Sequence, residues 1–136
     1  MDKALLQIYQ DLELIKNQNN DFDFEFWSAR DLMLVLGYST WAKFQEAIKR
    51  AEEACKTSGL SVSDHFAGAG KMVLTGSGAQ RRIDDVFLTR YACYLVAQNG
   101  DPRKVQIALA QTYFATQTRK QELLEQRENE NKRLFS

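Results

Sequence analysis

The chain has 136 residues, of which 44% are hydrophobic, and this length supports one compact domain with its own core. The 18 basic and 18 acidic residues cancel, which excludes a protein attracted to nucleic acid by net charge alone. No apolar run reaches the roughly 20 residues of a membrane span, and the first residues do not form a signal peptide. Cys55 and Cys93 lie far apart in apolar helical patterns, which is not the spacing of a disulfide pair or a metal site. We therefore expect a cytoplasmic protein with buried, reduced thiols.

The N-terminal part is predicted to form a helix followed by a strand. Apolar residues at helical spacing predict an amphipathic helix over residues 1–16, which ends in a polar run of asparagine and glutamine. Phe22, Phe24 and Phe26 then alternate with acidic residues, and this period of two predicts a half-buried strand. The first 31 residues hold three basic and seven acidic side chains, whereas residues 41–104 hold ten basic and seven acidic ones.

The next segment predicts two helices hinged on a glycine. Ser28 is a favoured N-cap for a helix over residues 29–36, with Asp31 in its first turn, and Gly37 supplies the left-handed stop. Ser39 or Thr40 caps a second helix over residues 41–56, whose apolar stripe runs through positions 41, 44, 48, 51 and 55. This pair is typical of a helix-turn-helix and indicates nucleic acid.

The outer face of the second helix favours a different role. Its charged residues form three opposite-charge pairs four residues apart: Glu46–Arg50, Lys49–Glu53 and Glu52–Lys56. Helices that enter a DNA groove are usually markedly cationic, so this pattern favours a scaffold role over base reading.

Residues 71–75 and 81–86 flank a glycine-rich tip and predict a β-hairpin that resembles the wing of a winged helix-turn-helix. The candidate nucleic-acid or partner contacts are Lys71, Arg81, Arg82, Lys43 and Arg30. A glycine tip lets backbone donors and guanidinium groups approach an anion closely. Two alternatives stay open: Asp84 and Asp85 hold the hairpin arginines internally, and Arg30 stacks on an aromatic ring.

The C-terminal part is predicted to be helical. Thr89 caps a helix that ends at Asn99 and Gly100, and Asp101 caps a last helix whose first residue is Pro102. We expect a single domain over residues 1–118, while residues 119–136 begin a polar helix or linker toward a further C-terminal region. We also expect that homo-oligomers can form through the C-terminal helix. The whole pattern predicts an α+β fold that is mainly helical, with a helix-turn-helix-like pair, a small β-sheet that includes the hairpin, and a long C-terminal helix.

No motif for catalysis or metal binding is evident. His65 is the only histidine, and it has no cysteine at ligand spacing and no nucleophile paired with it. The sequence has neither a phosphate-binding Walker loop nor a dinucleotide fingerprint. The aromatic residues fall on stripes that already have a packing role. We expect no enzyme activity, no metal and no cofactor.

Five segments spread over nearly the whole chain form a recognisable set. They are Trp27-Ser28-Ala29-Arg30, Leu36-Gly37-Tyr38-Ser39, Arg90-Tyr91-Ala92-Cys93-Tyr94-Leu95, Gln98-Asn99-Gly100-Asp101-Pro102 and Ala110-Gln111-Thr112-Tyr113-Phe114-Ala115. Together they resemble the DNA-damage-inducible protein D family, and the Ala-Arg-Asp and Leu-Gly-Tyr pieces also resemble the N-terminal domain of BRO-type phage antirepressors. The motif positions carried over are Trp27, Arg30, Gly37, Tyr38, Arg90, Tyr91, Asn99, Gly100, Asp101 and Pro102.

The resemblance implies a bacterial accessory protein of the DNA-damage (SOS) response, which acts around DNA and the RecA recombinase filament and catalyses no reaction of its own. Two interpretations remain open. In the first, the helix pair and the hairpin bind DNA through about three phosphates, and the affinity falls with salt. In the second, the chain docks on a recombinase filament, on itself or on a repressor, and has no direct contact with DNA. The hairpin favours the first interpretation, and the near-neutral charge favours the second.

Overall fold

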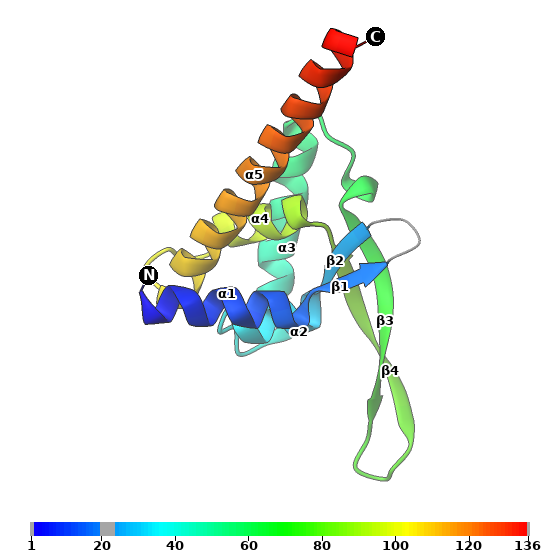
Figure 1. The fold of residues 1–136 in the computed structure, drawn as a ribbon. Coiled ribbons are helices and arrows are strands. Elements are labelled where there is room, and N and C mark those ends of the chain that lie inside the picture. Colours follow the sequence, from blue (N-terminus) through cyan, green and yellow to red (C-terminus); the bar gives the residue numbers. More distant parts are fainter. Residues whose placement is uncertain (1, 20–23, 136) are drawn as a thin grey trace.

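The structure, a computed structural model, describes residues 2–19 and 24–135, in which helices surround one core and an antiparallel sheet lies at the side (Figure 1). The helices are α1 (Lys3–Ile15), α2 (Ala29–Val35), α3 (Trp41–Thr57), α4 (Arg90–Gln98) and α5 (Val105–Phe135), with a 3-10 turn at Val62–Asp64. The strands are β1 (Asn17–Asn19), β2 (Phe24–Ser28), β3 (Phe66–Leu74) and β4 (Gln80–Leu88). The α+β prediction, mainly helical with a long C-terminal helix, is confirmed.

The helix ends follow from local chemistry. The side chains of Ser28, Thr40 and Thr89 each accept a hydrogen bond from the backbone N–H three residues on, which satisfies a donor left unpaired at the start of α2, α3 and α4. Gly37 follows α2 with a φ of 79°, and Gly59 follows α3 with a φ of 85°. The predicted hinge helices and their caps are therefore confirmed.

Trp27 is the centre of the core. Its side chain is fully buried, its indole Nε1 donates to the Leu12 carbonyl at 2.9 Å, and its ring packs edge-on against Phe114. Cys55 and Cys93 are free and buried, and burial raises the pKa of both thiols. The expected packing role of the aromatic residues is confirmed for Trp27 and Phe114.

A polar contact joins α1 to α5 at the edge of this core. The Tyr113 hydroxyl donates to the Glu13 carboxylate at 2.5 Å, and Lys16 donates to the same side chain at 2.8 Å. Burial opposes the ionisation of Glu13, but these two hydrogen bonds together with the charges of Lys16 and Arg90 outweigh burial and lower its pKa. Burial and the bond to Glu13 raise the pKa of Tyr113, so its hydroxyl stays protonated.

The sheet has the strand order β1-β2-β4-β3, and each neighbouring pair is antiparallel. β2 pairs with β4 only through Trp27↔Leu88 and Ser28↔Phe87, at the end of β4 nearest the core. β3 and β4 pair along their whole length, from Phe66↔Leu88 to Leu74↔Gln80. Their outer halves and the turn at 75–79 therefore extend away from the helices as an arm (Figure 1), which confirms the predicted hairpin and lengthens it at its root. We call residues 69–85 the arm.

Two sequence expectations in the N-terminal part need correction. The polar run after α1 was expected only to end the helix, but its residues 17–19 form strand β1 beside β2. The alternating strand is confirmed as β2, yet its buried face carries Trp27, while Phe24 is 45% exposed and stacks on Phe26. Phe22 lies outside the described residues.

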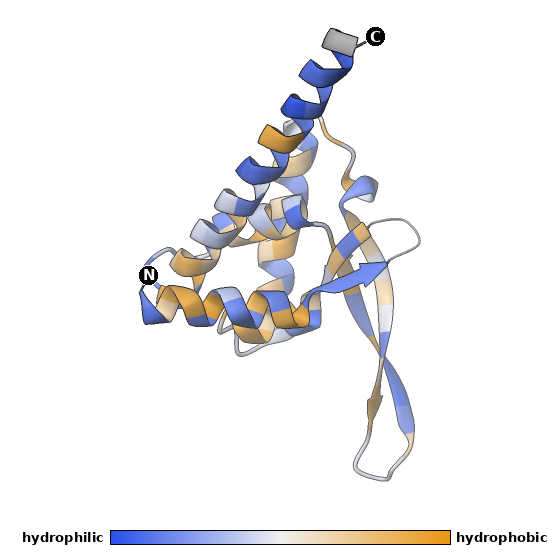
Figure 2. Cartoon of the chain, viewed as in Figure 1, coloured by the Kyte–Doolittle hydropathy of each residue, from blue (hydrophilic) through white to orange (hydrophobic). Residues whose placement is uncertain are grey.

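The expected start of the last helix is wrong. The Asp101 carboxylate accepts from the Arg103 backbone N–H at 3.0 Å, and the Asp101 carbonyl accepts from Lys104 N–H at 3.0 Å. These bonds form a local turn that competes with helix formation, so Pro102 lies in the turn and α5 begins at Val105. From there α5 continues without a break to Phe135, and its side chains at residues 119–133 are exposed and mostly polar (Figure 2).

None of the helices in the described part of the chain combines the length and the apolar character needed to cross a membrane.

Candidate nucleic-acid interface

A buried carboxylate fixes the arm to the helix pair. Asp85 on β4 is only 4% exposed, and it accepts hydrogen bonds from the Ser28 hydroxyl at 2.5 Å and from the Arg30 backbone N–H at 3.0 Å. Ser28 and Arg30 lie at the beginning of α2, where backbone N–H groups lack helical partners and negative charge is favourable. Asp85 therefore anchors the arm to the start of the helix pair, and it is not available to neutralise the arginines at the tip.

Arg30 makes a second link between the arm and the helices. Its guanidinium carbon lies 3.8 Å from the centroid of the Trp41 ring, and its Nε donates to the Asp84 carbonyl at 2.7 Å. Both contacts join α2, the beginning of α3 and the arm into one unit. The alternative prediction for Arg30, stacking on an aromatic ring, is confirmed, and its other predicted role as a DNA contact stays a prediction.

The cations of the arm differ in their availability. Lys71 forms an ion pair with Asp31 on α2, with Nζ and Oδ1 2.8 Å apart, so part of its charge is already matched. Arg81 and Arg82 are exposed, and within residues 2–19 and 24–135 neither forms an ion pair with a carboxylate. A Cβ at Gly70 would clash with the Arg82 side chain, so this glycine lets the guanidinium lie across β3. The arm therefore offers two exposed guanidinium groups.

The outer face of α3 is less neutralised than the sequence predicts. None of the three charge pairs expected there lies within 4 Å as an ion pair among the described residues. Arg50 instead donates from Nη2 to the Asn99 carbonyl at 3.2 Å. Lys43 is exposed and seven residues before Arg50, which places both on the same face of the helix. Lys43 therefore lies toward the loop before α5 and not beside Lys71, as the sequence hypothesis had placed it.

The resemblance motifs at 37–38 and 99–102 meet at this loop. The nearest atoms to a Cβ added at Gly37 belong to the Gln106 side chain on α5, with Cδ at 3.6 Å. The Lys104 Nζ lies 5.6 Å from the centroid of the Tyr38 ring. A Cβ on Gly100 would lie 2.8 Å from an Ile107 side-chain carbon, so the absence of a side chain there permits close packing. The structure thus brings together two turns that are 60 residues apart in sequence.

Arg90 and Tyr91 lie elsewhere. The Arg90 guanidinium contacts the Glu25 carboxylate, and Tyr91 packs against His65 at a centroid distance of 5.1 Å. His65 Nδ1 is 2.7 Å from the Thr89 hydroxyl that caps α4. All five line a cavity of about 460 Å³ between β2, the start of α4 and α5. Glu25 already balances the charge of Arg90, so Arg90 adds no unmatched positive charge. These motif residues therefore do not belong to the cationic surfaces of the arm and α3.

Sequence reasoning missed several residues of this interface. Asp85 was considered only as a partner of the arginines, because nothing in the local sequence indicates a contact with Ser28, 57 residues away. The sequence pairs Arg50 with Glu46 on its own helix, and it gives no local signal for Lys104. For Arg50 and Lys104, the only available signal was the general excess of basic residues over residues 41–104.

Comparison with known proteins agrees with the resemblance. Residues 15–115 match the BRO family, N-terminal domain. The chain is 48% identical over 134 residues to DNA damage-inducible protein D from Escherichia coli (strain K12), an alignment that covers 95% of this chain and 47% of that protein. The chain thus spans about half the length of this curated relative, and no solved structure matches it significantly. The match over residues 15–115 includes α2, α3, the arm and α4, and the chain belongs to the BRO N-terminal domain family.

Proposed function

We propose that this domain associates with DNA in the bacterial DNA-damage response and that it does so without catalysing a reaction. The damage-response part of the proposal follows the name of the Escherichia coli relative, DNA damage-inducible protein D. The DNA part rests mainly on one observation: Arg81 and Arg82 on the arm are exposed and have no carboxylate partner among the described residues. Exposed guanidinium groups of this kind suit the phosphate backbone, which accepts paired hydrogen bonds from arginine.

The anchoring of the arm supports this assignment. Since Asp85 and Arg30 tie the arm to α2 and to the beginning of α3, the arginines are held in a set position relative to the helix pair. The proposal follows the winged helix-turn-helix, in which one helix lies at the groove and a hairpin contacts the adjacent backbone. The arm would therefore position the domain on DNA, and phosphate contacts alone would confer no sequence preference.

The test is a binding titration with labelled single-stranded and duplex DNA at several salt concentrations. Each phosphate contact on a duplex contributes about −0.9 to the slope of log affinity against log salt. We expect the R81A/R82A variant to bind more weakly, with a slope less negative by about 1.8. The K49A/K56A variant is the matched control, because it removes two exposed cations from α3 and none from the arm. An unchanged slope in R81A/R82A, or no binding by the unmodified chain, would remove the proposal.

A second candidate function is docking on a protein, either a recombinase filament or a repressor. It is favoured by an exposed aromatic cluster at the root of the arm, where Phe26 lies 4.7 Å from Phe87 and 5.8 Å from Phe24 between ring centroids. Phe24 and Phe87 are 45% and 38% exposed. Single exposed apolar residues are ordinary, but a cluster of rings often marks an interface. Pull-downs that compare naked DNA, the free recombinase and the assembled RecA filament distinguish this function, because capture by the protein without DNA would favour docking.

A further inference from the structure

The two turns that meet beside α3 form a cationic surface of their own. One turn, residues 36–40, connects α2 to α3, and the other, residues 99–104, connects α4 to α5. Lys104 of the second turn approaches the Tyr38 ring of the first, and Arg50 on α3 bonds to the Asn99 carbonyl of the second turn. We call this region the turn surface, which consists of Tyr38, Lys43, Arg50 and Lys104.

The positive charge of the turn surface is largely unmatched. Within the described residues, Lys43, Arg50 and Lys104 are exposed and none of them lies within 4 Å of a carboxylate. The nearby Asp101 is held by Arg103, whose Nε and Nη2 donate to its two oxygens at 3.0 Å, and these bonds lower the pKa of Asp101. The Asp101 charge is therefore matched mainly by Arg103 within its own turn, with a smaller contribution from Lys104, so most of the positive charge of the turn surface remains.

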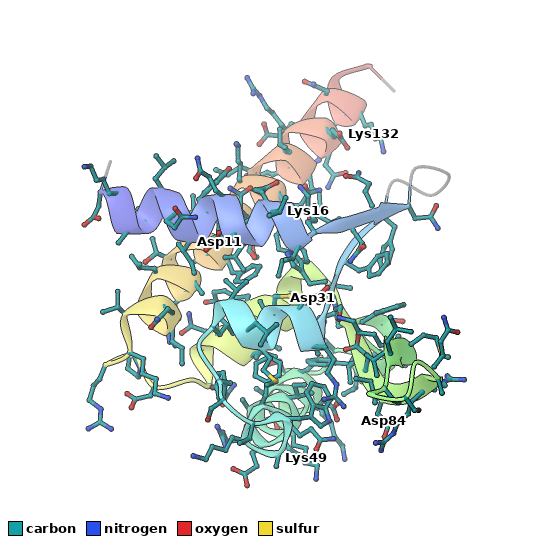
Figure 3. The ribbon with its side chains drawn as sticks, turned by 90° about the horizontal axis from the view of Figure 1, so that it is seen from below. Asp11, Lys16, Asp31, Lys49, Asp84 and Lys132 are labelled. Atoms are coloured by element: carbon teal, nitrogen blue, oxygen red, sulfur yellow. The ribbon has the colours of Figure 1, made fainter. Side chains whose placement is uncertain are left out.

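The turn surface and the arm lie on opposite sides of the beginning of α3. The Trp41 ring faces Arg30 and hence the arm, whereas Lys43, two residues later, is rotated by about 200° around the helix axis. Figure 3, which views the molecule from below, shows the same arrangement, with the arm on one side of α2 and α3 and the loop before α5 on the other. A polyanion that lies across the beginning of α3 would meet positive charge on both sides.

We propose that the turn surface is a second contact for the phosphate backbone of the DNA that the arm binds. The inference rests on the proposed DNA association and adds a site on the opposite side of α3. Lysine ammonium groups suit this role, because they are strongly hydrated point charges on flexible stems that follow a backbone without reading bases. The Tyr38 hydroxyl is a further donor, and burial raises its pKa, so it stays protonated at neutral pH.

The test uses K43A/K104A, which removes two cations of the turn surface and leaves the bond from Arg50 to Asn99 intact. We expect the slope of log duplex affinity against log salt to become less negative by about 1.8. When the salt concentration rises from 50 to 200 mM, the affinity of both proteins should fall. The factor by which it falls should be about 12 times smaller for the variant than for the unmodified chain. The K49A/K56A variant carries the same change in charge and should keep the original slope. The combination of K43A/K104A with R81A/R82A should make the slope less negative by the sum of the two effects.

The outcomes separate this inference from the proposed function. If R81A/R82A weakens binding while K43A/K104A behaves like K49A/K56A, the turn surface is not a DNA contact, although the DNA association stands. If the unmodified chain does not bind DNA, both proposals fail. Circular dichroism of each variant before and during heating provides the folding control, because a loss of binding counts only for a variant whose unfolding temperature matches that of the unmodified chain.

Discussion

The anchor of the arm makes the strongest prediction for stability. Replacing Asp85 by alanine removes the acceptor of three hydrogen bonds: two across the fold, from the Ser28 hydroxyl at 2.5 Å and the Arg30 N–H at 3.0 Å, and a local one from the Val86 N–H at 2.8 Å. Hydrogen bonds to a charged group each contribute about 1.5–3 kcal/mol, and part of this is recovered where water reaches the freed donors. We therefore expect D85A to lower the free energy of unfolding by about 3 kcal/mol, and D85N, which keeps one acceptor oxygen, by about 2 kcal/mol.

Urea unfolding followed by circular dichroism measures both losses, and the midpoint should move without a change in slope. The neighbouring Asp84 supplies the control, since its side chain is exposed and D84A should stay within about 0.5 kcal/mol of the unmodified chain. A double-mutant cycle of D85A with S28A should give a coupling of about 1–2 kcal/mol for the shared hydrogen bond. A D85A loss below about 0.5 kcal/mol, or a coupling near zero, would refute the anchoring role of this carboxylate.

Three further substitutions test other contacts. Y113F removes the bond to Glu13 and should cost about 1 kcal/mol at pH 7, discounted for the partial exposure of the carboxylate. Because folding lowers the pKa of Glu13 from its ordinary value of 4.5, this contribution is present above that pH and is lost as the pH falls through the folded pKa. A difference from the unmodified chain that does not shrink as the pH is lowered below 4.5 would contradict it. At Gly37, whose φ is 79°, replacement by alanine should lower the free energy of unfolding by about 1–2 kcal/mol, and replacement by asparagine should lower it by less. If thermal unfolding shows equal losses for G37A and G37N, backbone strain is not the cause. W27F removes the donor to the Leu12 carbonyl and creates a void in the core, so we expect the free energy of unfolding in urea to fall by about 2–3 kcal/mol. A fall of less than about 1 kcal/mol would contradict the central role of this ring.

The long-range contacts explain why the candidate site was only partly predictable. The cations of the arm could be found from sequence, because their local pattern of glycine and alternating residues predicts a hairpin. Whether these cations are free to bind a partner could not be predicted, since this depends on whether Asp85 turns toward Arg82 or toward Ser28. The structure shows the second arrangement, and it also pairs Lys71 with Asp31 across 40 residues.

Local chemistry in the sequence determined most of the helices, their caps, the glycine stops and the hairpin, because each depends on residues within a few positions of one another. Ser28, Thr40 and Thr89 cap their helices as expected, and Gly37 adopts a left-handed conformation. Tertiary structure alone decided the face of β2 that is buried and the meeting of two distant turns beside α3. These features result from packing and charge matching between segments that are far apart in the chain, and a pattern of neighbouring residues carries no record of such contacts.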